Sequence, residues 1–213
     1  MTEYTVPTST ILGENYKITK IEASNYNPTI DTDISITITV EDVYGDAITT
    51  EPTTIICSSG NFTAVNGSTI TPSDNVEINT GAGGIITLTY HCSEWGTINI
   101  MSGGNSIAIN VSGWRYIQGT SSSTWALRRN QDNAQLILKA YTKGSTITST
   151  DWTDFGGGTA YASNFKPATY KLCLNSEGTM YMRANSDGSF SIRAVSGSIS
   201  GSTNLYGILE WGI

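Results

Sequence analysis

Few residues of this sequence could carry out nucleophilic or acid–base chemistry. The single histidine, His91, directly precedes Cys92 in the stretch "LTYHCSEW". A cysteine nucleophile needs a histidine within hydrogen-bond reach, whereas neighbouring residues of an extended strand point to opposite faces. We therefore expect no Cys–His pair here and no catalytic residue at this position.

Two carboxylates, Asp151 and Asp154, stand three residues apart in "TDWTDFGGG". A pair of carboxylates can hydrolyse glycosides, and the alternative is a turn built by aspartates beside a glycine-rich loop. "FGGGT" does not predict a phosphate loop, because no Lys-Ser or Lys-Thr follows it. We keep both aspartates as candidate ligand-binding residues and predict a protein that is not an enzyme and needs no cofactor.

Metal binding finds little support in the residue types. The three cysteines, Cys57, Cys92 and Cys173, form no CxxC motif, and we expect free buried thiols, with a Cys57–Cys92 disulfide as the alternative because their strands could be neighbours. Acidic side chains gather at expected strand ends and could offer oxygen ligands to calcium, but their spacing matches no EF-hand. We predict no metal site and leave solvated loops or calcium open for Asp31, Asp33, Glu41, Asp42 and Asp46.

Aromatic residues of the second half are better candidates for binding. Trp152 and Tyr161 flank "FGGGT", and exposed aromatic rings stack on sugars and favour interfaces. Alternation in "GTMYMRANS" and "SFSIRAVSG" predicts that Tyr181, Arg183 and Arg193 face outward. The predicted ligand-binding set is therefore Trp152, Tyr161, Asp151, Asp154, Tyr181, Arg183 and Arg193, whereas Trp125, Tyr206 and Trp211 are expected in the core or in subunit contacts.

The net charge of −7 is unevenly distributed along the 213 residues. Residues 1–113 hold 12 acidic and 2 basic residues, and residues 114–213 hold 6 acidic and 9 basic ones, which gives −10 and +3. Such asymmetry indicates two modules, and neither charge favours nucleic-acid binding. We expect a flexible arm over 1–14, a first domain over 15–113 and a second over 114–213.

The first ten residues, "MTEYTVPTST", show neither the basic nor the apolar segment of a secretory signal. No apolar run approaches the length of a membrane span. We therefore expect a protein that is made in the cytoplasm, leaves it by no usual export route and does not insert into a membrane.

The first half predicts a β-sandwich. "DISITITVEDVYGD" alternates strictly, so that Ile34, Ile36, Ile38 and Val40 share one face. Further strands are expected over 16–24, 53–59, 83–100 (as two strands) and 106–113, with turns between them. The order of "ISITITVEDVYGDAIT", "IICSSGNFTAVNGSTIT" and "GGIITLTYHCSEWGTINI" resembles the bacterial Ig-like domains of invasins and phage structural proteins, over about residues 16–112. The resemblance implies a sandwich of the Ig-like type that serves as a spacer without catalytic residues.

The second half predicts another antiparallel sandwich, jelly-roll-like or related. Its expected strands include "TWALRRN", "AQLILKAYTKG", "GTMYMRANS" and "SFSIRAVSG", with a two-residue turn at Asp187-Gly188. The ordered elements Leu136–Ala140, Phe165–Pro167, Gly178–Ile192 and Tyr206–Trp211 resemble the C-terminal β-domain of phage tail-fibre and baseplate receptor-binding proteins. Arg128 and Arg129 are expected as charges that block pairing at a sheet edge.

These observations together predict a virion structural protein of a tail fibre or baseplate. The resemblance implies that it binds a host-surface glycan or protein through the second domain, contacts other virion proteins and forms a homotrimer. The alternative is a carbohydrate-binding module or a fragment of a cell-surface adhesin, and a glycan-cleaving enzyme is a third class.

Overall fold

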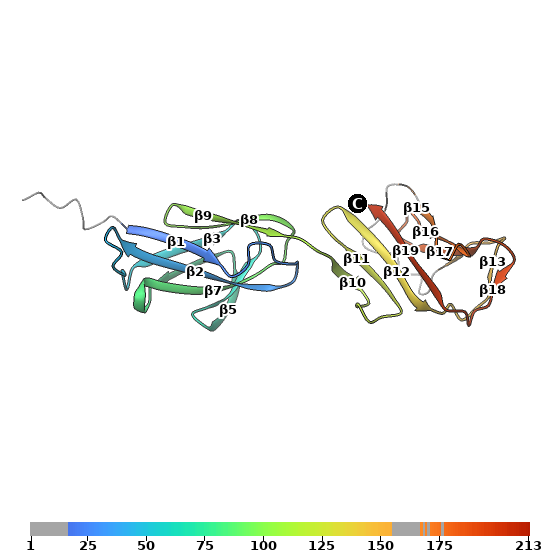
Figure 1. The fold of residues 1–213 in the computed structure, drawn as a ribbon, viewed down its shortest axis with the longest axis horizontal. Coiled ribbons are helices and arrows are strands. Elements are labelled where there is room, and N and C mark those ends of the chain that lie inside the picture. The colour runs from blue at the N-terminus through green and yellow to red at the C-terminus, as the bar shows by residue number, and fades with distance from the viewer. Residues whose placement is uncertain (1–16, 155–166, 168, 170, 176) are drawn as a thin grey trace, which may run out of the picture. The chain divides into compact units, whose positions relative to one another are not determined.

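The computed structural model describes every residue of the chain except 1–16, 155–166, 168, 170 and 176. It divides into two units, one ending at Ser112 and one beginning at Gly113 (Figure 1). The predicted all-β class is confirmed, since the described residues form antiparallel sheets and a single short helical turn, η1 (Ala82–Gly84). Among the described residues, no helix has the length and apolar character needed to cross a membrane. The predicted arm over 1–14 lies outside the described residues.

The first unit is a sandwich of two antiparallel sheets. One sheet has the strand order β1-β2-β7-β4-β5 and the other β6-β3-β8-β9. The strands are β1 (Lys17–Ala23), β2 (Asp33–Asp42), β3 (Pro52–Cys57), β4 (Asn61–Val65), β5 (Ser68–Ser73), β6 (Asn75–Asn79), β7 (Ile85–His91), β8 (Gly96–Ser102) and β9 (Asn105–Val111).

The strand order of the first unit is that of an immunoglobulin-like domain. Constant-type domains place strands A, B, E and D in one sheet and C, F and G in the other. Here β1, β2, β7 and β4 follow the first order and β3, β8 and β9 the second, while β5 and β6 extend the two sheets. The order of the paired strands therefore supports an Ig-like architecture, in addition to the sequence pattern.

Alternating burial explains why these strands form a sandwich. Ile34, Ile36, Ile38 and Val40 of β2 are buried and the residues between them are not, as the pattern predicts. Residues of β3, β8 and β9 complete the core from the other sheet. Each fully buried Ile or Val contributes roughly 1.5–3 kcal/mol.

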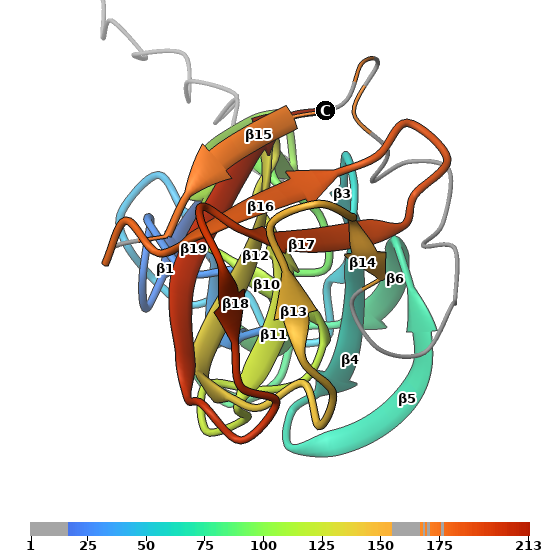
Figure 2. The ribbon, with the colours of Figure 1, turned by 90° about the vertical axis from the view of Figure 1, so that its right-hand side faces the viewer.

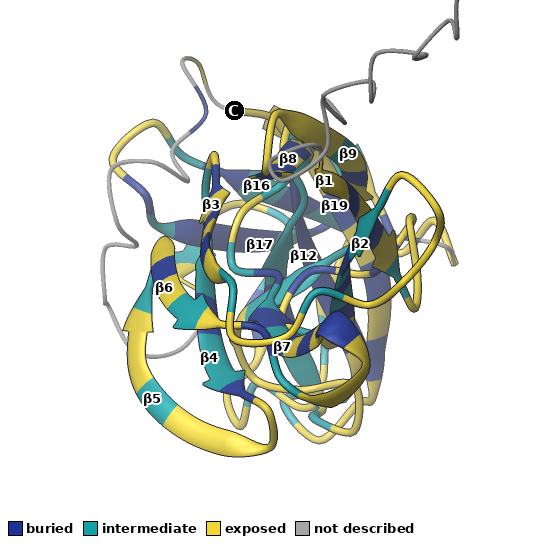
Figure 3. Ribbon diagram, turned by 90° about the vertical axis from the view of Figure 1, so that its left-hand side faces the viewer, coloured by how far each residue is buried: buried dark blue, intermediate teal, exposed yellow. Residues whose placement is uncertain are grey.

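Strands β4, β5 and β6 were not predicted from the sequence. β5 is largely exposed (Figure 3) and carries a single large apolar side chain, Ile70, so no alternation of apolar and polar residues marks it. Asn66 and Gly67 both have positive φ, 48° and 79°, which defines the tight turn between β4 and β5. The turn residues were therefore a better signal for this hairpin than its strands.

A hydrogen bond from a buried tyrosine stabilises the turn between β3 and β4. Tyr90 of β7 is fully buried, and its hydroxyl donates a 2.7 Å hydrogen bond to the carbonyl oxygen of Ser59. Gly60 has φ +78°, and a Cβ there would lie 2.3 Å from the Tyr90 hydroxyl oxygen. Both the backbone angle and the close contact therefore require glycine.

The two cysteines of the first unit face the core as free thiols. Cys57 and Cys92 are buried and not bridged, and β3 and β7 lie in different sheets. The expectation that their strands could be neighbours was wrong, because the chain crosses between sheets after β2. Burial, aided by Asp74, raises the pKa of the Cys57 thiol from 9.0 to about 11. Burial also raises the pKa of Cys92 and, with the two thiols nearby, that of Tyr90.

The second unit is also an antiparallel sandwich. Its sheets have the orders β10-β11-β12-β19 and β14-β17-β16-β15, with a separate pair β13-β18. The strands are β10 (Arg115–Gln118), β11 (Trp125–Arg129), β12 (Asn133–Tyr141), β13 (Ile147–Thr148), β14 (Thr153–Asp154), β15 (Lys171–Leu174), β16 (Met180–Ala184), β17 (Phe190–Ala194), β18 (Ser198–Ile199) and β19 (Leu205–Gly212).

The core of the second unit lies between its two four-stranded sheets. Phe190 packs on Trp211 with ring centroids 5.5 Å apart, so Trp211 is a core residue, whereas Tyr206 is 42% exposed. The two-residue strands β13, β14 and β18 were missed, because so short a strand carries no period. The buried side chains from the two sheets and β13 are Leu127, Ala134, Leu136, Leu138, Ile147, Met180, Met182, Ala184, Phe190, Ile192, Ala194, Leu205, Leu209 and Trp211.

Two local expectations for the second unit were wrong. The hairpin between β16 and β17 exists, but Asn185 pairs with Ser189 and the loop has three residues. Gly188 alone in this loop adopts positive φ, at 90°, as in a type I turn closed by a glycine bulge.

Arg128 does not protect an edge, since β11 lies between β10 and β12. Its guanidinium donates to Gln135 Oε1 at 2.8 and 2.9 Å and stacks 4.7 Å from the Trp114 ring centroid.

Replacing Gly60 should destabilise the first unit more than replacing another left-handed glycine. Gly60→Ala combines backbone strain with displacement of the buried Tyr90 ring, and we expect a loss of about 3 kcal/mol. Gly67→Ala meets no atom within 4 Å and should lose only about 1 kcal/mol. Urea denaturation of the two variants measures the difference, and equal losses would contradict the contact with Tyr90.

Alkaline pH should weaken the first unit through Cys57. Its raised pKa means that the folded state holds the thiol proton more tightly, so this stabilisation is complete below pH 9 and is lost as pH rises through 11. The loss should reach up to about 3 kcal/mol. Unfolding of Cys57→Ala should show a shallower fall between pH 9 and 11 than the parent chain, and a parallel fall would refute the assignment.

Candidate binding face

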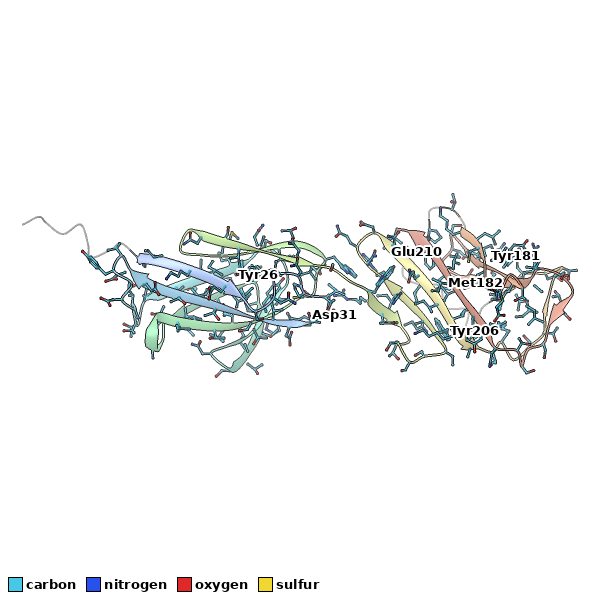
Figure 4. All side chains as sticks on the ribbon, in the orientation of Figure 1. Tyr26, Asp31, Tyr181, Met182, Tyr206 and Glu210 are labelled. Carbon is cyan, nitrogen blue, oxygen red and sulfur yellow. The ribbon has the colours of Figure 1, made fainter. Side chains whose placement is uncertain are left out.

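The pairing of β16 with β17 creates an outward face of polar and aromatic side chains. Met182 lies opposite Ile192, and both are fully buried in the core. Tyr181 and Met182, labelled in Figure 4, are neighbours on β16 and differ in burial as alternation requires. The partly exposed residues on the side away from the core are Tyr181, Arg183 and Arg193, and Ser191 lies buried beneath them.

Trp152 joins this face from the short strand β14. Thr153 pairs with Ile192 and Asp154 with Ser191, so β14 lies beside β17 (Figure 2), and Trp152 directly precedes β14 in the chain. The guanidinium carbons of Arg183 and Arg193 lie 4.1 and 4.9 Å from the centroid of its ring. Both distances fall within the range of a cation–π interaction.

Tyr181 extends the same stack. Its ring centroid lies 5.5 Å from the guanidinium carbon of Arg193, opposite which it sits in the ladder. The structure therefore brings four of the seven predicted residues together from two distant segments of the chain. We call Trp152, Tyr181, Arg183 and Arg193 the arginine–aromatic face.

The two guanidiniums of this face form no direct ion pair with any residue that the structure describes. Within the described part of the chain, neither guanidinium has a carboxylate within 4 Å. Among the described residues, the buried Nε atoms of Arg183 and Arg193 have no hydrogen-bond partner, and Nη2 of Arg183 makes a long 3.5 Å contact to Ser191 Oγ. A buried donor without an acceptor is unfavourable, but a ligand cannot reach the covered Nε atoms, so any acceptor that binds here would pair with the terminal Nη groups.

The remaining predicted residues occupy other places. Asp154 is exposed at the margin of the face, with Oδ1 accepting a 3.5 Å contact from Ser191 Oγ. Asp151 accepts a hydrogen bond from Thr150 Oγ1 at 2.8 Å within its own turn. The two aspartates thus have separate partners, and the structure gives no support to a shared carboxylate site. Tyr161 lies outside the described residues.

Two leucines of β15 border the face and were not predicted. Leu172 pairs with Arg183 and Leu174 with Tyr181, and the two side chains are 49% and 51% exposed. Residue type favours burial for leucine, so composition alone could not place them outside. The pairing register of β15 was the only signal, because it turns Cys173 toward the core instead.

The other candidate sites have structural roles. His91 and Cys92 lie on opposite faces as predicted: Cys92 is buried, and His91 Nδ1 lies 2.7 Å from Asp33 Oδ1. Asp42 Oδ1 accepts hydrogen bonds from the backbone of Tyr44 and Asp46 and so shapes a turn. Among the described residues, no group of three or more metal-ligating side chains gathers in one place.

Comparison with known proteins yields only distant structural likeness. No protein-family model and no curated protein sequence matches the chain. The adhesin InvE of Yersinia pseudotuberculosis aligns with a TM-score of 0.35 and 11% identity over 92% of this chain, which spans 58% of that structure. Domains 4–9 and domains 5–6 of the surface-layer protein SbsC align with TM-scores of 0.29 and 0.28, each at 13% identity and over 92% of this chain; the chain spans 30% and 97% of those two structures. At such scores no residue of one protein is placed on a residue of another, and the assignment of the first unit rests on its own strand order.

The stacking of Trp152 on Arg183 should be measurable as a coupling energy. In a double-mutant cycle of Trp152→Leu and Arg183→Gln, we expect a coupling of about 0.5–1 kcal/mol in the free energy of unfolding. Tyr206→Leu combined with Arg183→Gln provides the control, since Tyr206 belongs to the other sheet. A coupling near zero for the first pair, or equal couplings for both, would show that the stack contributes nothing.

Proposed function

We propose that this chain is a non-enzymatic attachment protein, in which an Ig-like unit serves as spacer and the second unit binds a host-surface ligand. The observation that supports this most directly is the arginine–aromatic face, where two guanidiniums that contact no carboxylate of the described residues lie beside partly exposed Trp152 and Tyr181. Trp, Tyr and Arg are the residue types that most often dominate binding energy at interfaces.

The setting that we propose is a virion surface, as part of a tail fibre or baseplate assembled in the host cytoplasm with other virion proteins. The ordered resemblance of the second unit to receptor-binding domains supports this. We propose further that the chain acts as a homotrimer, because several copies of a weak site raise the overall affinity. Light scattering at tens of micromolar tests the trimer, and a monodisperse monomer would overturn it.

A cell-surface adhesin or carbohydrate-binding module is the second candidate. The Ig-type strand order of the first unit fits it equally well, since such a unit can carry a binding module away from any surface. The two candidates share the same face and differ in what carries the chain. Detection of the chain in purified virions by mass spectrometry would favour the first, and its detection only in cell envelopes the second.

The attachment function can be tested with the full chain, labelled and applied to a panel of bacterial cells and to a glycan array. We expect binding that falls about tenfold or more in Trp152→Ala and in Tyr181→Ala, because these rings would lose their contact with the ligand. Tyr206→Ala is the matched control, an exposed tyrosine of the other sheet. Absence of binding to every cell and glycan by a folded chain, or equal losses in all three variants, would overturn the proposal.

A further inference from the structure

The arginine–aromatic face carries two positive charges, for which a neutral ligand would supply no counter-charge. Arg183 and Arg193 stand on adjacent strands two residues apart in register and so on the same face, since Arg183 pairs with Ser191 and Arg193 with Tyr181. Both guanidiniums approach the same indole ring. Two like charges held this close repel each other unless an anion joins them.

The hydrogen-bonding state of the two guanidiniums points to the same chemistry. Their Nε atoms are buried and have no partner among the described residues, so an anion would meet the terminal Nη groups, which can also act as a fork that holds a carboxylate, sulfate or phosphate in two bonds. Arg128 on the other sheet shows the contrast, because its Nε and Nη2 both donate to Gln135 Oε1. As far as the structure describes the chain, the Nε atoms of the two face arginines therefore lack the acceptor that Arg128 has.

The margin of the face adds a second requirement. Asp154 is exposed beside Ser191, and a carboxylate accepts hydrogen bonds from hydroxyl groups while repelling anions. The rings of Trp152 and Tyr181 offer apolar surfaces on which a sugar ring can stack. A ligand that satisfies all three features carries an anion at one position and hydroxyl groups at another.

From this arrangement we propose that the face binds an acidic carbohydrate. Its carboxylate or sulfate pairs with Arg183 and Arg193, its ring stacks on Trp152 and Tyr181, and its hydroxyl groups donate to Asp154. The proposal rests on the attachment function above and specifies the chemical class of its ligand. Exposed charges of this kind are screened by salt, so binding weakens as ionic strength rises.

Isothermal titration calorimetry of the full chain with defined oligosaccharides tests the proposal. Hyaluronan oligosaccharides supply carboxylates, heparin oligosaccharides supply sulfates, and chitohexaose is neutral. We expect binding of at least one acidic probe, at least tenfold weaker binding in Arg183→Gln and in Arg193→Gln, and a further loss in the double variant. Arg183→Lys and Arg193→Lys keep the charge but not the fork and should lie between the parent chain and the Gln variants.

Arg128→Gln is the control that removes an arginine stacked on tryptophan from the other sheet. It should leave binding unchanged, and circular dichroism establishes that each variant is folded. Acidic probes that bind equally well to the Arg183→Gln and Arg193→Gln variants would overturn the inference.

Two other results separate this inference from the attachment function. Binding to chitohexaose that depends on Trp152 but not on the arginines would overturn the acidic ligand and leave the attachment function intact. Arginine-dependent binding to poly-glutamate with none to the acidic sugars would overturn the carbohydrate assignment in favour of an acidic polypeptide. Lack of binding to every probe, cell and glycan would overturn both proposals together.

Discussion

The burial of Met182 against Ile192 is the constraint on which the arginine–aromatic face depends. The two residues lie opposite each other on β16 and β17 and are fully buried, and each contributes roughly 1.5–3 kcal/mol by leaving water. A shift of one residue in either strand would turn Arg183 or Arg193 into the core, where an unpaired charge is far more costly. The core therefore fixes the register, and the register puts both arginines outside.

Apolar burial likewise shapes the first unit, where the buried hydroxyl of Tyr90 adds a polar constraint. Isoleucines of β2, β8 and β9 fill its core, but Tyr90 carries a hydroxyl into it. That hydroxyl is satisfied by the Ser59 carbonyl oxygen, and the bond demands close passage of the backbone at Gly60. A buried polar group thus specifies the conformation of a turn that apolar packing alone would leave open.

Trp152 provides the aromatic surface against which both guanidiniums lie. A guanidinium is weakly hydrated and stacks well on aromatic rings, so the indole covers part of each charged group while Asp154 stays at the margin. The contact exists because β14 adds only two residues to the sheet and leaves Trp152 beside Arg193. Such a face can hold charge next to an apolar surface, which is a combination suited to recognition.

The sequence by itself determined the all-β class, the long alternating strands and the outward direction of Tyr181, Arg183 and Arg193. These features follow from a period of two, which is local and legible in "GTMYMRANSDGSFSIRAV". It did not reveal β14, because two residues have no period, nor the exposed Leu172 and Leu174, because residue type suggested burial. Only the tertiary structure shows that the Trp152 ring contacts both guanidiniums and that Asp151 and Asp154 have different hydrogen-bond partners. Those outcomes depend on pairing between segments about thirty to forty residues apart, and no local pattern encodes which strands pair or in what register.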